Sequence, residues 1–559
     1  MPDKESAVSF DVPASILRDR KSVAAPLAKV LPHKLALPFV ELVTNGQIPS
    51  DPQLANSLAV FTADNAEAAI SALNAVSAAC LLDEKLIGKA LTVNATTRAI
   101  LSVGSNRFLW TLGARATGED TSLRAVKSFF ESAIKWLAGI QAMSLFVSPD
   151  PGLASGIAVN PDHERVRRVY STTVRFSWVT EYLCNAIADC VSLLGDGTPF
   201  PSGASITEVL SYIKRMLVGM GHLPNRDLEG LSEGARDLLS AASVHQGHLA
   251  NISNFADVFL SSEIENHPFI AIGGEPHLLG VREAAVGFEH VLFEIARSTL
   301  GEKQRGDLLE AVVSRCIADL GPAELTRLHP PIAIEISKPH DPGEVDFAFV
   351  SSPLAIIGEC KARLVTKESS SVINAFSDQV GKAADQLRSR LFAFAHGSKL
   401  VSSQISSVSD IDSSAAIGLG ITLHPYATAV WDRDALEEID AFAADLLVMP
   451  IHQLIIWIHA MRSAEEIIDY ADVRYRLLSA GAVVHDEIDF LAFFMHPQRG
   501  SLLASFEAIA EGNRLIIRPL SVPTPWALQI KKPESAEAWV AALQEIMMSE
   551  LWAPSPNRT

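Results

Sequence analysis

Two short apolar runs between residues 343 and 364 have charged residues at their ends, and they constrain the fold more than any other segment. The segment reads GEVDFAFVSSPLAIIGECKARL. Its β-branched and aromatic residues predict two strands. A charged side chain is costly to bury unless it is paired or binds a metal, so Asp346, Glu359 and Lys361 need partners. We expect adjacent antiparallel strands that bring Asp346 and Glu359 together at one end of a sheet.

The residues around these strands predict the other elements of an α/β unit over residues 300–435. A helical pattern in GEKQRGDLLEAVVSRCIADLG ends at Gly321-Pro322, and a short strand pattern, PPIAIEIS, follows it. After the two strands comes a long amphipathic helical pattern, SSSVINAFSDQVGKAADQLRSRLFAFA, and then a strand pattern, AAIGLGITLHPYATAVW. The predicted order is therefore α, β, β, β, α, β.

The regions on either side of this unit are expected to be mainly α-helical. Residues 1–150 form one helical region, and residues 151–295 form a second that could be continuous with the first. Residues 440–559 carry helical periodicity in LLVMPIHQLIIWIHAMR, SAEEIIDYADVRYRLLSA and DEIDFLAFFMH. One further short strand is predicted in this last region, in RLIIRPLSVP.

Phosphodiester hydrolysis is a chemistry that this arrangement of charges suits. The reaction uses a divalent cation that polarises the phosphate and lowers the pKa of an attacking water. Mg²⁺ takes hard oxygen ligands, usually one or two carboxylates with several waters, and a nearby lysine can stabilise the developing charge. Side chains alternate along a strand, so Glu359 and Lys361 share one face and Cys360 takes the other. We predict that Asp346 and Glu359 hold Mg²⁺, for which Mn²⁺ is expected to substitute.

These residues resemble the motif of the PD-(D/E)XK nuclease superfamily, which has the restriction-endonuclease-like fold. Asp346, a spacer of twelve residues and then Glu359-Cys360-Lys361 match the superfamily's Asp, spacer and Glu-x-Lys. The predicted element order also resembles that core, and the resemblance covers residues 300–432. It implies that Asp346 and Glu359 bind the metal and that Lys361 is catalytic. It also implies that the backbone carbonyl of Cys360 is a metal ligand.

The resemblance implies further residues on the two helices of the core. Many members add a glutamate on the first core helix, and Glu310 in RGDLLEAVV fits that place as a metal ligand. Glu289 on the preceding helix competes for the same role. Several branches carry a glutamine near the site on the following helix, for which Gln379 and Gln386, on one face of that helix, are candidates. One departure is that Val345, and not proline, precedes the aspartate.

A structural interpretation of the same residues also exists. Glu359 and Lys361 could form an exposed, ion-paired strand end, and Asp346 could be its turn partner. The bare pattern of an acid, any residue and lysine occurs at three places: Asp19-Arg20-Lys21, Asp83-Glu84-Lys85 and Glu359-Cys360-Lys361. The third alone follows an apolar strand, with an Asp-bearing strand before it and a helix after it. This context favours the functional interpretation.

The composition limits the class of protein. A formal net charge of −19 over 559 residues argues against a protein that coats nucleic acid through bulk positive charge. Residues 301–400 are nearly neutral, with 12 Lys and Arg against 13 Asp and Glu. The five cysteines include no Cys-x-x-Cys pair, which indicates neither a zinc ribbon nor a disulfide framework. We identify no apolar signal core and no membrane span, and expect a cytoplasmic protein.

These observations together predict a divalent-metal-dependent nuclease that hydrolyses DNA. Bacterial defence against foreign DNA is the setting expected by analogy with the superfamily. The helical regions would sense a target, or bind a partner protein or a second copy of the chain. Two alternatives stay open. One is a catalytically degenerate nuclease fold that serves as a nucleic-acid- or protein-binding scaffold, and the other is RNA as the substrate.

Overall fold

The structure is a computed structural model, and its described residues form two compact units. The described residues of unit 1 fall within 1–153 and 245–261, and those of unit 2 within 154–244 and 262–526. The described residues are 27–44, 52–76, 104–115, 123–147, 177–195, 197–218, 227–245, 247–249, 254–255, 264, 267–272, 275–278, 281–334, 343–352, 354–363, 369–398, 400–402, 415–423, 430–431, 433–483, 487–494, 499–510 and 515–516. Among these residues, none of the helices combines the length and the apolar character needed to cross a membrane.

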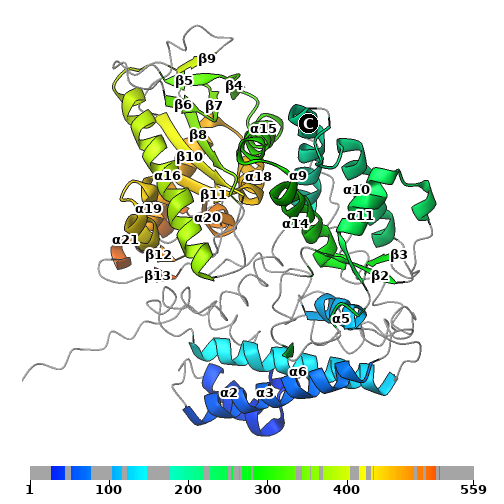
Figure 1. Ribbon diagram of the computed structural model, residues 1–559. Coiled ribbons are helices and arrows are strands. Elements are labelled where there is room, and N and C mark those ends of the chain that lie inside the picture. Colours follow the sequence, from blue (N-terminus) through cyan, green and yellow to red (C-terminus); the bar gives the residue numbers. More distant parts are fainter. Residues whose placement is uncertain are drawn as a thin grey trace, which may run out of the picture. The chain divides into compact units, whose positions relative to one another are not determined.

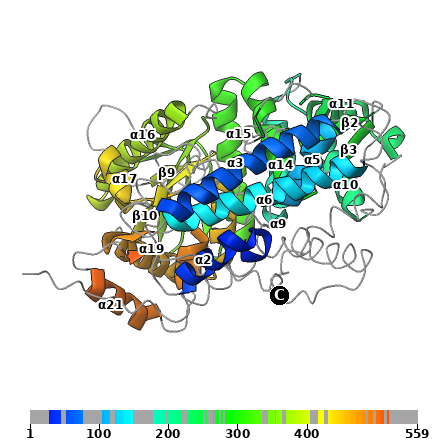
Figure 2. The ribbon, with the colours of Figure 1, turned by 90° about the horizontal axis from the view of Figure 1, so that it is seen from below.

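Unit 1 is helical in its described part, as expected. Its helices are α2 (His33–Thr44), α3 (Pro52–Asn74), α5 (Gly104–Arg115) and α6 (Leu123–Val147). Helices α3 and α6 lie side by side along most of their length (Figure 2). Their contact buries small and apolar side chains, among them Leu54, Leu58, Ala138 and Ala142. Small residues let the two helices approach closely and exclude water from the seam.

Unit 2 begins with a group of helices and a small sheet. The helices are α9 (Ser177–Cys190), α10 (Gly203–Val218), α11 (Glu233–Ala241), α14 (Val281–Thr299) and α15 (Glu302–Leu320). Helix α9 packs against α10, α14 and α15. The strands β1 (Ser243–His245), β2 (Phe269–Ile272) and β3 (Glu275–Leu278) form a three-stranded sheet. The described part of residues 151–295 is therefore mainly helical, with these short strands added to it.

A mixed five-stranded sheet stands at the centre of unit 2 (Figure 1). Its order is β11-β10-β8-β7-β4, and its strands are β4 (Thr326–Arg327), β7 (Phe347–Val350), β8 (Ala355–Lys361), β10 (Ala416–Thr422) and β11 (Leu447–Pro450). Strand β10 runs parallel to both β8 and β11, whereas β7 runs antiparallel to β8 and to β4. The chain is thus mostly helical with an α/β centre, which agrees with the coarse fold class that the sequence predicts.

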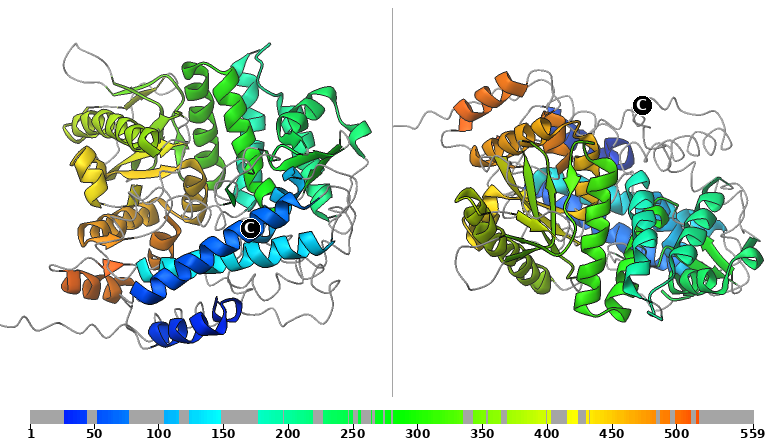
Figure 3. Two further views of the ribbon diagram at one scale, coloured as in Figure 1. Left: turned by 60° about the horizontal axis from the view of Figure 1, so that its bottom comes forward. Right: turned by 90° about the horizontal axis from the view of Figure 1, so that it is seen from above.

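Helices cover both faces of this sheet. Helix α16 (Ser369–Ala395) packs on β8 and β10. Helix α15 packs against β8, and α18 (Ile451–Ala460) packs against β10 and β11. The sheet therefore lies between α16 on one side and α15 on the other (Figure 3, right). Every residue of β8 except the last is buried, as expected for a central strand with both faces covered.

Three details of the α/β region differ from the predicted elements. The strand predicted in PPIAIEIS is β5 (Ile332–Ile334), which pairs with β6 (Gly343–Val345) and β9 (Leu400–Ser402) in a separate three-stranded sheet. The segment EVDFAFV is not one strand, because it divides between β6 and β7 at Asp346. The helix predicted for LLVMPIHQLIIWIHAMR is wrong over its first residues, which form β11. That strand carries the central sheet beyond residue 435, the end predicted for the α/β unit.

Helix α17 (Arg433–Ile439) precedes β11, and α19 (Ala464–Ser479), α20 (Glu487–Phe494) and α21 (Arg499–Ala510) follow α18. The sequence predicts α19 and α20, in SAEEIIDYADVRYRLLSA and DEIDFLAFFMH, but no separate helix for α17 or α21. Two short strands, β12 (Ala482–Val483) and β13 (Leu515–Ile516), pair in parallel, and β13 lies in the segment predicted to be a strand.

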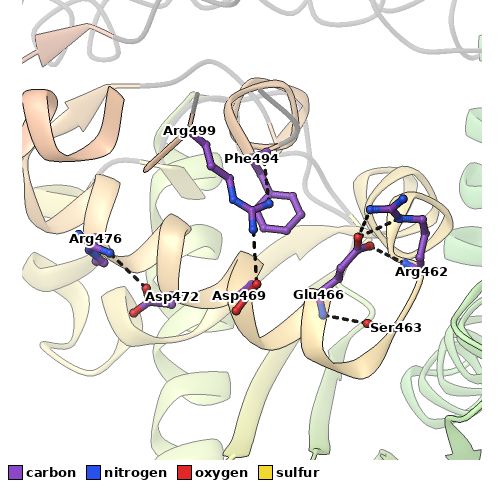
Figure 4. A network of polar contacts seen from close by, with 8 residues as sticks. All are labelled: Arg462, Ser463, Glu466, Asp469, Asp472, Arg476, Phe494 and Arg499. Carbon is purple, nitrogen blue, oxygen red and sulfur yellow. Dashed lines mark hydrogen bonds and ion pairs between the residues drawn. The ribbon is translucent and has the colours of Figure 1, made fainter. Parts of the chain in front are cut away.

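Polar contacts fix the ends of α19 and α21 (Figure 4). Ser463 caps α19, because its hydroxyl accepts a hydrogen bond from the backbone N–H of Glu466. The guanidinium of Arg499, at the start of α21, donates to Asp469 at 3.4 Å and lies over the Phe494 ring at 4.3 Å. The contacts of Arg499 thus link α21 to α19 and α20.

Candidate functional site

The pairing of β7 with β8 places Asp346 beside Glu359. Phe347 is opposite Gly358 in the register, so Asp346 comes one residue before this pair and Glu359 one residue after it. A Cβ atom on Gly358 would lie 1.9 Å from the Phe347 ring, so only glycine allows the ring to lie there. The half-buried Asp346 side chain accepts a hydrogen bond from the backbone N–H of Cys360 at 2.6 Å. This bond ties the aspartate to the end of β8.

The Glu359 carboxylate is almost fully buried and lies between two cations. Its side chain is 1% exposed. It forms an ion pair with the guanidinium of Arg390 on α16 and another, at 3.0 Å, with the ammonium of Lys361. A buried carboxylate needs such partners, because its desolvation is otherwise not offset. The described partners of Glu359 are therefore cationic side chains, and its role as a metal ligand stays a prediction.

Lys361 joins β8 to α16. Its side chain is 14% exposed, and its ammonium donates to the Gln386 side-chain oxygen at 2.6 Å and to Glu359. Burial lowers the pKa of Lys361 from its usual 10.5, and the neighbouring Asp346 and Glu310 carboxylates act in the opposite direction. The lysine is thus held in place by two acceptors and stands within electrostatic reach of two carboxylates.

Glu310 approaches the site from α15 on the other side of the sheet. It is half-buried, and burial, together with the repulsion of the Asp346 carboxylate, raises the pKa of Glu310 from 4.5 to about 7. Lys361 acts in the opposite direction on the same group. Burial is the larger cause, and the Asp346 carboxylate adds negative potential between α15 and the start of β7. A cation placed there would be stabilised by the same field.

The remaining predicted residues divide into those at the site and those away from it. Burial raises the pKa of the Cys360 thiol well above its usual 9.0, so the side chain is a protonated, buried group and no nucleophile. Of the two predicted glutamines, Gln386 is the one that contacts Lys361 in the described hydrogen bonds. Gln379 donates to Asp378 at 3.2 Å instead. Glu289 is buried on α14 and accepts a hydrogen bond from Thr180 at 3.3 Å, which places it with α9.

The residues present fit a divalent cation in part. Among the described residues, no group of three or more His, Cys, Asp and Glu side chains is arranged to hold a metal ion. Asp346 and Glu310 nevertheless supply two carboxylates, the number that Mg²⁺ commonly takes together with waters. In a strand the N–H and C=O of one residue point to the same side. The Cys360 carbonyl therefore points to the side of Asp346, with which the N–H bonds.

Arg390 is the residue of this site that the sequence analysis misses. It lies on the face of α16 that buries Leu387 and Phe394, and only 9% of its side chain is exposed. An arginine on an apolar helical stripe is a signal that a charged partner faces it. That signal is present in QLRSRLFAFA, but its partner is identified only when β8 and α16 are packed together.

The side chains at the end of β8 are the evidence for the chemistry of this site. A comparison of the chain with protein-family models, with curated proteins and with solved structures finds no match.

Proposed function

We propose that this protein is a divalent-metal-dependent nuclease whose active site lies at the end of β8. One observation carries the proposal. The ammonium of Lys361, at the end of β8, interacts electrostatically with two carboxylates, Asp346 just before β7 and Glu310 on α15. A fixed cation beside two carboxylates is the arrangement that metal-assisted phosphoryl chemistry needs. The resemblance of Asp346 and Glu359-Cys360-Lys361 to the PD-(D/E)XK motif supports the same proposal.

Each residue has a distinct role in this proposal. Asp346, Glu310 and the Cys360 carbonyl would hold Mg²⁺, with Mn²⁺ as a substitute, and the bound cation would polarise the phosphate and acidify a water. Asp346 is oriented by the Cys360 N–H, which fixes one of its oxygens. Lys361 stabilises the negative charge that develops on the phosphate oxygens. Gln386 holds the lysine through its side-chain oxygen.

DNA is the substrate that we propose, and defence of a bacterial cell against foreign DNA is the proposed setting. Both come from the superfamily resemblance. Two exposed cations, Arg363 and Lys382, flank Lys361 and are bridged by Asp378. They could meet phosphates on either side of the scissile bond, since phosphate contacts supply most of the affinity for nucleic acid. The local charge thus suits a polyanion in spite of the acidic chain.

A second function is favoured by a specific observation. The Glu359 carboxylate is engaged by Arg390 and Lys361 in a buried cluster, and such a cluster also suits a degenerate nuclease fold that serves as a binding scaffold. In that case Lys361 would be a structural cation, and its loss would change stability but no reaction.

A cleavage assay separates the two functions. Plasmid DNA, linear DNA and RNA are incubated with the protein and Mg²⁺ or Mn²⁺, with Asp346→Ala and Lys361→Ala as variants. We expect metal-dependent cleavage of DNA by the wild type, and losses of about 100-fold or more in both variants. Asp237→Asn, on the exposed face of α11, is the matched control that should cleave normally. Cleavage that survives both alanine variants would refute this site.

A further inference from the structure

Two contacts join α16 to β8 side by side: the buried ion pair between Arg390 and Glu359, and the hydrogen bond between Lys361 and Gln386. Arg390 and Gln386 are four residues apart on α16, and Glu359 and Lys361 are two residues apart on β8. Four helical residues rise about 6 Å, and two strand residues rise about 6.6 Å. The two spacings match, so Arg390 contacts Glu359 while Gln386 contacts Lys361. The match requires α16 to run antiparallel to β8, which is the direction of a helix between the parallel strands β8 and β10.

Packing also restrains the arginine. Gly343, the first residue of β6, lies against the Arg390 side chain, and a Cβ atom there would be 3.2 Å from Nε and 3.4 Å from Cγ. The stem of Arg390 therefore lies between a glycine backbone and the buried face of α16. A side chain at residue 343 would therefore displace the Arg390 stem, so the glycine helps to keep the guanidinium at Glu359.

We propose that Arg390 is a positioning residue, which holds the Glu359 carboxylate so that Glu359 orients the Lys361 ammonium and does not bind the metal. The inference rests on the proposed nuclease function and departs from the ligand set that the sequence predicts. If Glu359 turned to a divalent cation, Arg390 would be left as a buried charge without its carboxylate. With Glu359 held in place, the flexible lysine has two fixed acceptors, Glu359 and Gln386. The metal then depends on Asp346, Glu310 and the Cys360 carbonyl.

Two measurements on the full chain test this assignment. The first is calorimetric titration with Mn²⁺ in the absence of nucleic acid. We expect Glu359→Gln and Arg390→Met to keep a dissociation constant for Mn²⁺ within about threefold of wild type, whereas Asp346→Asn weakens binding about tenfold or more. The second is the single-turnover cleavage rate at saturating Mn²⁺. Glu359→Gln and Arg390→Met should each lower this rate about 10- to 100-fold. The DNA-binding affinity should stay unchanged.

Three further variants keep the test informative if a buried charge disturbs folding. Arg390→Lys retains the positive charge without the planar fork, and its rate should lie between those of wild type and Arg390→Met. The double variant Glu359→Gln/Arg390→Met removes both buried charges and should fold, with normal Mn²⁺ affinity and a low rate. Arg388→Met is the control, because this arginine is on the same helix and its ion pair with Asp440 is at the surface.

The outcomes distinguish this inference from the proposed function. Mn²⁺ binding that Glu359→Gln weakens as much as Asp346→Asn does would make Glu359 a ligand and overturn the inference alone. A wild-type rate in Arg390→Met would also overturn it. If the wild type binds Mn²⁺ and cleaves no nucleic acid, the nuclease proposal fails while the binding comparison still decides the role of Glu359. If the wild type binds no Mn²⁺, both are refuted.

Discussion

Replacement of Glu310 by glutamine should make the protein less sensitive to pH, because the Glu310 carboxyl is forced to ionise near other negative charge. Its pKa is raised from 4.5 to about 7, first by burial and then by Asp346. The unfolded chain therefore releases this proton at lower pH than the folded protein does. Between about pH 4.5 and 7 the folded state binds more protons, so the free energy of unfolding falls as pH rises through this window.

The size of this effect follows from the two pKa values. The difference between 4.5 and about 7 corresponds to an upper limit of ~3 kcal/mol. Glu310 is only partly buried, and solvent screening reduces the figure to about 1–2 kcal/mol. Glu310→Gln keeps the shape of the side chain and removes the titration. The variant should therefore gain about 1–2 kcal/mol on the wild type between pH 4.5 and pH 8.

Urea denaturation followed by circular dichroism at a series of pH values measures this difference. Glu438→Gln, on the exposed face of α17, is the matched control for a loss of one negative charge. Saturating Mn²⁺ should reduce the difference at high pH, because a cation near Glu310 offsets the repulsion. Parallel pH curves for wild type and Glu310→Gln would refute the reasoning, since they would show that folding does not raise the pKa of Glu310.

Substitutions at three other positions test the geometry and charge around β8. Gly358→Ala places a Cβ atom 1.9 Å from the Phe347 ring and should lower the free energy of unfolding by about 1–3 kcal/mol. Gly500→Ala, where nothing lies within 4 Å of the added Cβ, should be nearly neutral, and equal effects in urea denaturation would contradict the register. If Arg363 and Lys382 contact phosphates, alanine at each should lower the slope of log K against log salt for DNA binding by about one, as measured by fluorescence anisotropy. An unchanged slope in the double variant would exclude them from the DNA-binding surface.

Local sequence patterns were sufficient to predict the elements that carry the site. Helices α15 and α16 and strand β8 follow the predicted segments closely, because each has a long periodic or β-branched run with clear ends. The alternation of a strand also predicts that Glu359 and Lys361 share a face, and they are in contact. The sequence therefore predicts the secondary structure of β8 and α16 and the face of β8 on which Glu359 and Lys361 lie.

Features that depend on tertiary packing could not be predicted in the same way. The sequence predicts a helix where β11 forms, because LLVMPIHQLIIWIHAMR is mostly apolar and its periodicity does not divide it. Parallel pairing with β10 makes its first residues a strand, and Pro450 is both the last residue of β11 and the N-cap of α18. Arg390 is an ordinary helix arginine in sequence, and its role depends on its ion pair with Glu359.

Asp346 should hold the metal that the cleavage reaction needs. The decisive measurement is the single-turnover rate of plasmid cleavage in Mn²⁺ for wild type, Asp346→Asn and Asp237→Asn. We predict that Asp346→Asn lowers the rate about 100-fold or more and that Asp237→Asn leaves it unchanged. Equal rates in wild type and Asp346→Asn, with both proteins folded, would contradict the assignment of a nuclease site to the end of β8.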